Sequence, residues 1–427
     1  MLNLKYILPL LFATIVSCNT QRTTNEGKSS NTNNSKYEKM KKSAATQIKH
    51  QPVDYSTFTA DDNGFALKLF DIVCKNEPKE NLCISPASAS WALSMTANGA
   101  SGNTLKQMME ILGITNCTPD SLNKRQRALI SALISNSEET KLSIANSIWI
   151  NKPLTVKPTF IKANVTYYDA QVKNLPFDAA TLDSINSWCS DNTNGKITSI
   201  LDKLDEQTMM LLLNALYFKG LWSKPFIKDA TTEADFTTAD GNTLKVQMMN
   251  QTFRTGYFGN DSIQIVSKPF GDGRFEMLFA LPAKGLSLSE ATTLMGQHYT
   301  EWRKRMERGV NVSLALPRFK VEYDTSLKDA LKALGMTDAF DKKADFSLIS
   351  AAPLLINDVV QKCYVKVNEN GAEAAAVTAA VMELMSARPA MRKESVVLDR
   401  PFIYMITYTE ASQSNILFIG KAGAPQE

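Results

Sequence analysis

Residues 369–386, ENGAEAAAVTAAVMELMS, form an alanine-rich stretch between segments that alternate as β-strands do. The strand-like patterns lie at 353–368 before it and at 400–408 and 414–420 after it. Alanine is the best helix former, yet no amphipathic stripe runs through 369–386 for a helix to bury. The fold must therefore accommodate a long segment of small side chains that does not follow the pattern of a packed helix.

Two helices are predicted from the signals at their ends. Ser85 and Pro86 supply an N-cap hydroxyl and a first-turn proline, and Gly99 ends that helix. The second helix lies within 324–335, with Thr325 as its N-cap.

Strand patterns lie between these two helices. The run 210–218 is almost continuously apolar, which predicts a strand covered on both faces. Residues 270–281 hold a Gly-Asp-Gly turn followed by alternating apolar residues, which predicts a hairpin. No helix pattern follows these glycines, so a phosphate-binding loop is disfavoured.

The first 17 residues predict an export signal, because one early cation precedes an apolar run too short to span a bilayer stably. The end of this run, Ile15 to Cys18, resembles a bacterial lipobox, in which the cysteine is acylated and becomes the mature N-terminus. The alternative is an ordinary secretory signal in which Cys18 is incidental. We expect residues 1–17 to be a lipoprotein signal peptide, and the protein to be lipid-anchored at the bacterial outer membrane or cell surface, on its periplasmic or extracellular face.

Residues 18–54 are expected to be an acylated cysteine and a disordered tether, since 19–53 are rich in Asn, Thr, Ser and Lys. A flexible chain of this length reaches roughly 30 Å. Residues 19–53 also hold seven basic and two acidic side chains, so the formal net charge of +4 belongs to the tail. The body, 55–427, is expected to be one domain, and it shows no sign of a nucleic-acid-binding face.

Few residues suit catalysis or metal binding. Hydrolases of the Ser-His-Asp or Cys-His type need a histidine beside the nucleophile. Of the two histidines, His50 lies in the tail and His298 lies in a polar helical stretch without a nucleophile motif. The five cysteines after Cys18 never take a C-x-x-C spacing, which indicates neither a zinc site nor a dense disulfide framework. We expect a protein that is not an enzyme and has no cofactor or metal.

Six segments resemble the signatures of the serpin family, in serpin order and spacing. They are 81–104, 214–222, 316–347, 367–376, 399–406 and 416–421. The resemblance covers about residues 55–425. It implies an α+β serpin fold with three β-sheets, eight or nine helices and an exposed reactive-centre loop near the C-terminus.

The resemblance gives the alanine-rich stretch a role. In serpins, a protease that cuts the reactive loop lets its N-terminal half insert into the main sheet as a new strand, a known example of β-strand addition. Alternate side chains of a strand share a face, and those of the inserting strand are small enough to enter a preformed slot. Gly371 allows the hinge to bend. The implied hinge residues are Glu369, Gly371, Ala372, Glu373, Ala374, Ala375, Ala376 and Thr378.

Other positions carry over from the resemblance one by one. Ser85, Ser88 and Asn214 match the polar cluster that lets the central strands of the main sheet part. Trp222 matches the tryptophan beneath the top of that sheet, where insertion begins. Gln361 stands where serpins often have a histidine, and glutamine can both donate and accept hydrogen bonds.

The cleaved bond is estimated by counting along the family pattern. The cleaved residue usually lies sixteen positions after the hinge glutamate, which here gives the bond Met385–Ser386, with Leu384 as the next candidate. Methionine suits the apolar pocket of elastase-, chymotrypsin- or subtilisin-like proteases. Arg388 suits a trypsin-like enzyme, but Pro389 follows it, and a proline there commonly blocks cleavage.

The resemblance therefore implies a monomeric suicide-substrate inhibitor that traps a target serine protease as a covalent acyl complex. One alternative is a non-inhibitory serpin that acts as a binding module. A second is an inhibitor that also traps cysteine proteases. A hydrolase is disfavoured by the two histidines.

Overall fold

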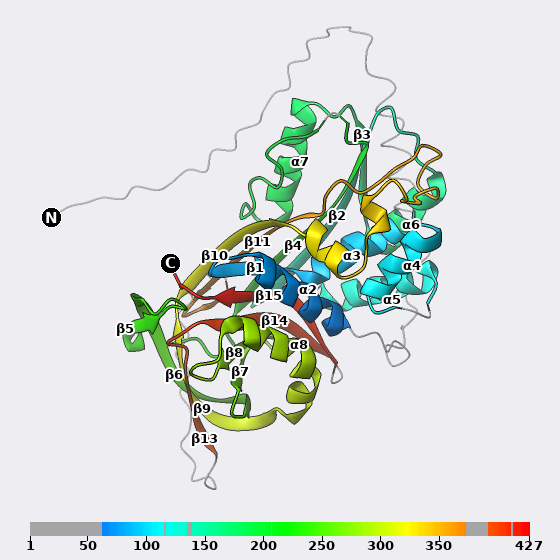
Figure 1. Ribbon diagram of the computed structural model, residues 1–427. Coiled ribbons are helices and arrows are strands. Elements are labelled where there is room, and N and C mark those ends of the chain that lie inside the picture. Colours follow the sequence, from blue (N-terminus) through cyan, green and yellow to red (C-terminus); the bar gives the residue numbers. More distant parts are fainter. Residues whose placement is uncertain (1–61, 115–116, 135–138, 206, 373–391, 411–412) are drawn as a thin grey trace, which may run out of the picture.

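The computed structural model describes residues 62–114, 117–134, 139–205, 207–372, 392–410 and 413–427 (Figure 1). The predicted signal peptide, Cys18 and the tether lie outside the described residues. The same holds for hinge residues 373–378, for Leu384 and for the predicted bond between Met385 and Ser386.

Eight α-helices lie in this part of the chain. They are α2 (Asp62–Asn76), α3 (Pro86–Ala97), α4 (Gly102–Ile111), α5 (Pro119–Leu133), α6 (Pro158–Tyr168), α7 (Ala179–Asn192), α8 (Leu288–Arg305) and α9 (Lys328–Ala333). Two short 3-10 helices, η2 (Lys228–Ala230) and η3 (Asp338–Phe340), accompany them. None of the described helices is both long and apolar enough to cross a membrane.

The strands alternate with these helices along the chain. They are β1 (Asn81–Ile84), β2 (Thr140–Asn151), β3 (Gln171–Leu175), β4 (Met210–Leu221), β5 (Thr232–Thr237), β6 (Thr243–Gly259), β7 (Ile263–Phe270), β8 (Phe275–Pro282), β9 (Glu307–Pro317), β10 (Phe319–Ser326), β11 (Val360–Asn368), β12 (Gly371–Ala372), β13 (Lys393–Val397), β14 (Phe402–Glu410) and β15 (Gln413–Ala422).

The described strands form two hydrogen-bonded sheets, and the larger one combines two of the three sheets that the resemblance implies. One sheet has the order β10-β11-β12-β4-β2-β3. The other nine strands share one hydrogen-bonded network, because the long strand β6 pairs with β5 and β9 over most of its length and with β7 only at its end. Strand β6 therefore belongs both to the sheet with β5, β9 and β13 and to the sheet with β7, β8, β14, β15 and β1.

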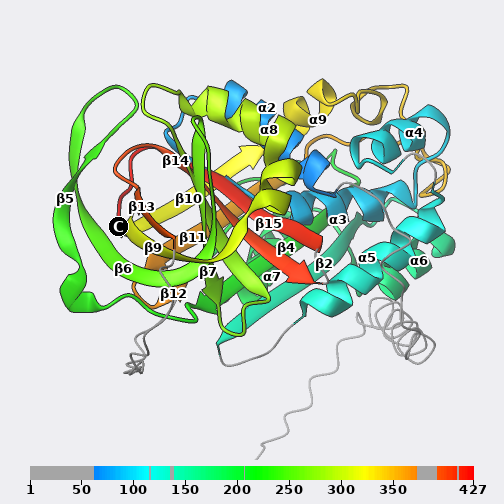
Figure 2. The same cartoon turned by 90° about the horizontal axis from the view of Figure 1, so that it is seen from below.

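The central part of β4 is covered on both faces, as the apolar run 210–218 predicts. On β4, Leu213 and Ala215 pack with helix α7 on one face, whereas Leu216 and Phe218 belong to the main core on the other. Helix α3 contacts β4 on the core side, between this sheet and β15 (Figures 1 and 2). Within 213–218, a residue's parity along β4 therefore decides whether it faces α7 or α3.

Two local predictions are confirmed and one is wrong. Helix α3 starts at Pro86 with Ser85 as its N-cap, and Phe270 pairs with Phe275 across the predicted hairpin turn. Thr325 does not cap a helix. It lies in β10, where it pairs with Gln361 of β11, and helix α9 begins only at Lys328. The ladder between β10 and β11 continues through Thr325, so its backbone is held extended rather than at a helix start.

Candidate functional site

Strand β12 lies between β4 and β11 in the six-stranded sheet (Figure 2). Ala372 pairs with Val367 on one side and with Gly220 on the other, and both ladders are antiparallel. In the described part of the chain, β4 and β11 each pair with β12 and not with one another. The start of the predicted hinge therefore already occupies the position of a central strand.

Gly371 is required by the close approach of the hinge to β4. Its φ is 153°, in the region that glycine tolerates. A Cβ atom at this position would stand 1.9 Å from the backbone oxygen of Gly220. Ala372 follows with only 3% of its surface exposed. Only glycine and then a small residue fit this part of the sheet.

Glu369 anchors the two-residue turn that joins β11 to β12. Its carboxylate oxygen Oε1 accepts hydrogen bonds from Arg318 Nε at 2.8 Å, from Arg318 Nη2 at 2.6 Å and from Thr231 Oγ1 at 2.7 Å. Burial raises the pKa of the Glu369 carboxyl, but the hydrogen bonds from Arg318 and Thr231 outweigh it and hold that pKa below the usual value. Glu369 is therefore a buried, ionised anchor. Arg318 also contacts Glu427 at 3.1 Å.

Trp222 holds the backbone of the hinge. Its indole Nε1 donates to the oxygen of Asn368 at 2.9 Å, and its backbone N–H donates to the oxygen of Asn370 at 2.8 Å. The backbone N–H of Phe226 donates to the oxygen of Glu369 at 2.8 Å. The Trp222 ring is buried and stacks on Phe270 with centroids 4.3 Å apart. Three successive hinge carbonyls are thus bound by the segment that follows β4.

A buried lysine packs against the aromatic rings of this segment. The ammonium of Lys268 lies 5.4 Å from the ring centroid of Trp222 and 4.1 Å from that of Phe226. It donates to the oxygen of Lys224 at 3.0 Å and to Gln251 Oε1 at 2.7 Å. Burial, together with the charge of Lys224, holds the pKa of Lys268 well below that of an ordinary lysine.

Sequence reasoning missed Arg318, Thr231 and Lys268. Arg318 lies within a segment that carried the family resemblance, but nothing local marks it as the partner of Glu369. Lys268 could have been noticed, because a lysine in the otherwise mostly apolar strand β7 must either reach solvent or be satisfied inside.

The predicted polar cluster separates into two pairs. In the first, Ser85 and Gln361 bind reciprocally. The backbone N–H of Ser85 donates to Gln361 Oε1 and Gln361 Nε2 donates to the oxygen of Ser85, both at 2.8 Å. The Ser85 hydroxyl accepts from the backbone N–H of Ser88 at 3.2 Å and donates to the oxygen of Leu417 at 2.8 Å. Gln361 therefore ties β11 to the start of α3.

The second pair joins the neighbouring strands β4 and β2. Asn214 Nδ2 donates to Asn146 Oδ1 at 2.8 Å, and Asn146 Nδ2 donates to the oxygen of Tyr168 at 2.8 Å. Asn214 Oδ1 is buried and has no hydrogen-bond partner among the described residues. No hydrogen bond within the described chain links Asn214 to Ser85, Ser88 or Gln361. The residues of the predicted cluster therefore lie on one face of the sheet, but no continuous hydrogen-bond network among the described residues joins them.

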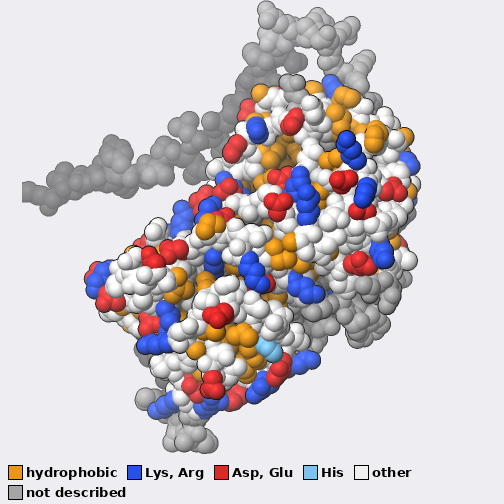
Figure 3. Space-filling view, viewed as in Figure 1, with side chains coloured by type: hydrophobic (Ala, Val, Ile, Leu, Met, Phe, Trp, Pro, Cys, Tyr) orange, Lys and Arg blue, Asp and Glu red, His pale blue; other side chains and the backbone are white. Residues whose placement is uncertain are grey.

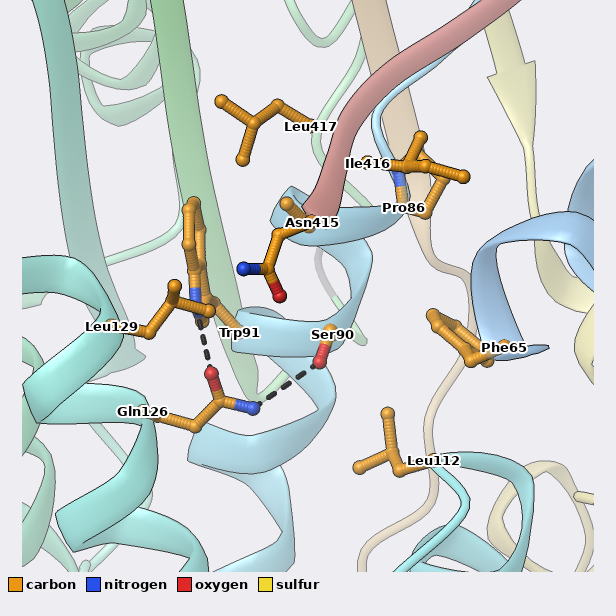
Figure 4. Close-up of a pocket in the computed structure, with 11 residues that line it drawn as sticks. Phe65, Pro86, Ser90, Trp91, Leu112, Gln126, Leu129, Asn415, Ile416 and Leu417 are labelled. Atoms are coloured by element: carbon orange, nitrogen blue, oxygen red, sulfur yellow. Dashed lines mark hydrogen bonds between the residues drawn. The ribbon is translucent and has the colours of Figure 1, made fainter. Parts of the chain in front are cut away.

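The cavity beside α3 offers little room for a small ligand. A cavity of about 20 Å³ lies between α3, α5 and the end of β15 nearest α3, lined by Ser90, Trp91 and Gln126 among others (Figure 4). Gln126 accepts from Trp91 Nε1 at 3.0 Å and donates to Ser90 Oγ at 3.3 Å. The cavity has space for about one water molecule. No group of three or more potential metal ligands occurs among the described residues.

The comparisons with known proteins agree with this fold. The family model described as Serpin (serine protease inhibitor) matches residues 60–425. Serpin B9 of Homo sapiens is 33% identical over 375 residues, which cover 84% of this chain and 97% of that protein. Leukocyte elastase inhibitor of Homo sapiens is 32% identical over 378 residues, which cover the same two shares, 84% and 97%. The structure of the thermophilic serpin tengpin in its native state matches with a TM-score of 0.78 and 34% identity, covering 88% of this chain and 96% of that one.

The match therefore includes nearly all of the described chain and nearly the full length of these relatives. The family description and the name of the second relative are those of protease inhibitors. By sequence and by fold, the chain belongs to the serpin family of serine protease inhibitors.

Proposed function

We propose that this serpin is an active, single-turnover inhibitor of elastase-, chymotrypsin- or subtilisin-like serine proteases. The observation that carries the proposal is the pairing of Gly371 and Ala372 with both β4 and β11. The chain that follows Ala372 can extend this two-residue strand between β4 and β11, because an antiparallel strand there completes both ladders.

The register of β12 also supports this proposal at Thr378, further along the hinge. If the ladder continues residue for residue, Thr378 comes to lie opposite Asn214 on β4 and Gln361 on β11. The hydroxyl of Thr378 is then a donor for Asn214 Oδ1, which is buried without a partner among the described residues. Ala374 and Ala376 fall on the same face and leave space for the buried side chains around them.

The proposed chemistry belongs to the protease. Its catalytic serine attacks the carbonyl carbon of Met385, the bond to the nitrogen of Ser386 breaks, and that nitrogen takes up a proton to leave as the new N-terminus. The acyl ester to Met385 then hydrolyses unless the loop inserts first and distorts the protease. Inhibition is therefore decided by a race between insertion and deacylation.

Two finer elements of the proposal concern the target and the location. A methionine at the cleaved bond suits an apolar pocket, and one relative carries the name leukocyte elastase inhibitor. Replacement Met385→Arg is expected to redirect inhibition to trypsin-like proteases. If Leu384→Arg produces this redirection instead, the cleaved bond lies one residue earlier.

If Cys18 anchors the protein through its acyl chains, Cys18→Ala moves it from the membrane fraction to the soluble fraction, and an unchanged distribution contradicts the anchor.

Mixing the protein with elastase and with chymotrypsin tests the inhibitory function. On a denaturing gel we expect a band near the summed mass of the two proteins, since an acyl ester survives denaturation. A non-inhibitory serpin would instead give only cleaved or uncut chain with both proteases. Parallel reactions with a cysteine protease of the papain type decide whether that class is also trapped.

A further inference from the structure

Four lysines face one another in like-charged pairs across the six-stranded sheet. Lys141 of β2 lies directly opposite Lys219 of β4, and Lys320 of β10 lies directly opposite Lys366 of β11. Their neighbours Leu142, Gly220 and Val367 are buried, so the four lysines share the opposite, solvent-facing side of the sheet. Like charges directly opposite each other across a ladder are destabilising.

Little in the described structure neutralises these pairs. Lys320 lies 3.6 Å from Glu322 and over the ring of Tyr364. The other three lysines have no ion pair within the described residues. Figure 3 shows basic side chains interspersed with acidic ones along the outline of the body beside β10 and β11. A carboxylate placed between the two lysine pairs would have a cation on either side.

The chain itself carries such a carboxylate at the right position. Ala372 pairs with Gly220 and Val367, so the next residue, Glu373, falls opposite Lys219 and Lys366 when the ladder is extended by one step. The Ala372 side chain is buried, and side chains alternate along a strand, so an extended strand would direct the Glu373 side chain to the lysine side. One further step of β12 therefore completes a row of two lysines, a glutamate and two lysines.

We propose that this lysine row is a receptor for the Glu373 carboxylate, and that Lys219 and Lys366 position the first inserting residue during inhibition. The inference rests on the proposed function. Before insertion each pair of lysines is repulsive, and insertion of Glu373 relieves both pairs at once. The attraction acts on the first step after Ala372, where the race with deacylation begins. The lysines neither react nor touch the cleaved bond, so they are positioning residues.

Charge reversal with rescue tests the proposal. We expect Glu373→Lys to raise the number of serpin molecules consumed per trapped elastase about two- to fivefold, the size of an exposed charge effect on the insertion rate. Adding Lys366→Glu to that variant should return the number toward the wild-type value. Lys362→Glu is the matched control, because Lys362 shares the strand and face of Lys366 but falls opposite Val377 in the extended register. It should not rescue.

Salt distinguishes an electrostatic role from simple packing. The difference between wild type and Glu373→Lys should shrink between about 0.05 M and 0.5 M salt, because exposed charges are screened. Glu373→Lys that behaves as wild type, or rescue by Lys362→Glu as effective as that by Lys366→Glu, would overturn the proposal. Tight binding of dextran sulfate to the lysines combined with a neutral Glu373→Lys effect would show that the row serves an external polyanion instead.

A second readout does not depend on inhibition. When a protease cuts the loop C-terminal to residue 378, the melting temperature of the cut wild type should rise, and it should rise less in Glu373→Lys and more again after addition of Lys366→Glu. If the wild type gains stability on cleavage but traps no protease, the proposed inhibitory function is wrong. The comparison of melting temperatures between the variants still tests the role of the lysine row in that case. If the gain is the same in all variants, or absent in all, the lysine row has no role in insertion and the inference is wrong.

Discussion

Arg318 binds Glu369 through two nitrogens, with Nε 2.8 Å and Nη2 2.6 Å from the same carboxylate oxygen. The Glu369 carboxylate is buried and the Arg318 side chain is 30% exposed, so the pair lies between the sheet interior and solvent, where the hinge begins. Thr231 contributes the third hydrogen bond. Together they fix the first residue of the turn into β12.

Replacement of Arg318 by alanine should destabilise the protein by about 1–3 kcal/mol, because it leaves the buried Glu369 charge without its main partner. Glu427→Gln is the matched control. It removes only the exposed partner of Arg318 and should cost less than about 0.5 kcal/mol. Denaturant unfolding measures both, and equal effects of the two variants would contradict a central role for Glu369.

The same pair predicts a pH dependence. The pKa of Glu369 is lower in the folded protein than its usual value of 4.5, so the ionised pair contributes stability above that value. The contribution should be lost as the pH falls through the lowered folded-state pKa. We expect the stability difference between wild type and Glu369→Gln to be largest near neutral pH and to vanish in acid. A difference that grows as the pH falls would contradict this sign.

Gly371→Ala should disrupt β12 far more than an ordinary glycine replacement. The new Cβ would collide with the backbone of Gly220, and the backbone is strained for any other residue. Gly273→Ala is the control, because Gly273 also has a positive φ but has free space around its Cβ position. We expect a loss of about 2 kcal/mol or more for Gly371→Ala and about 1 kcal/mol for Gly273→Ala by thermal unfolding. Equal losses would show that the close approach to β4 is unimportant.

Much of this scaffold follows from local sequence, but the contacts that hold the hinge do not. The almost continuous apolar run at 210–218 predicts a strand covered on both faces, and the Gly-Asp-Gly turn predicts the hairpin, because both signals depend on neighbouring residues. Arg318 and Glu369 are 51 residues apart. Gln361 reaches the backbone of Ser85 across 276 residues. Such partners are chosen by the packing of distant strands, and no spacing in the chain encodes them.

The family resemblance located the polar cluster but not its bonding. It grouped Ser85, Ser88, Asn214 and Gln361, whereas the structure pairs Gln361 with Ser85 and Asn214 with Asn146. The reason is physical: Gln361 and Asn214 lie on strands that are separated by the position of β12. Thr325 was misassigned for a similar reason, because a hydroxyl that suits a helix cap also suits a strand, and the ladder to β11 decided between them.

Ala372→Arg should convert the inhibitor into a substrate. Ala372 already lies between β4 and β11 and is 3% exposed, so a longer cation there has no room in the strand from which insertion must extend. A cost of only about 1.4 kcal/mol on the insertion barrier slows insertion tenfold and lets deacylation win. We expect elastase to cut the variant at the wild-type bond and to release it, so that a denaturing gel shows cleaved product and no complex. Trapping as efficient as that of wild type would contradict the insertion mechanism.

Hydrogen exchange of β4 and β11, before and after the loop is cut, tests the central claim most directly. That claim is that the chain after Ala372 becomes a strand between them. Among the described residues, each strand has one edge toward β12 that is paired only near its end. After cleavage we predict strong new protection of the amides of β4 and β11 on these facing edges, down to the level of Asn214 and Gln361. Unchanged exchange in both strands after complete cleavage would contradict the claim.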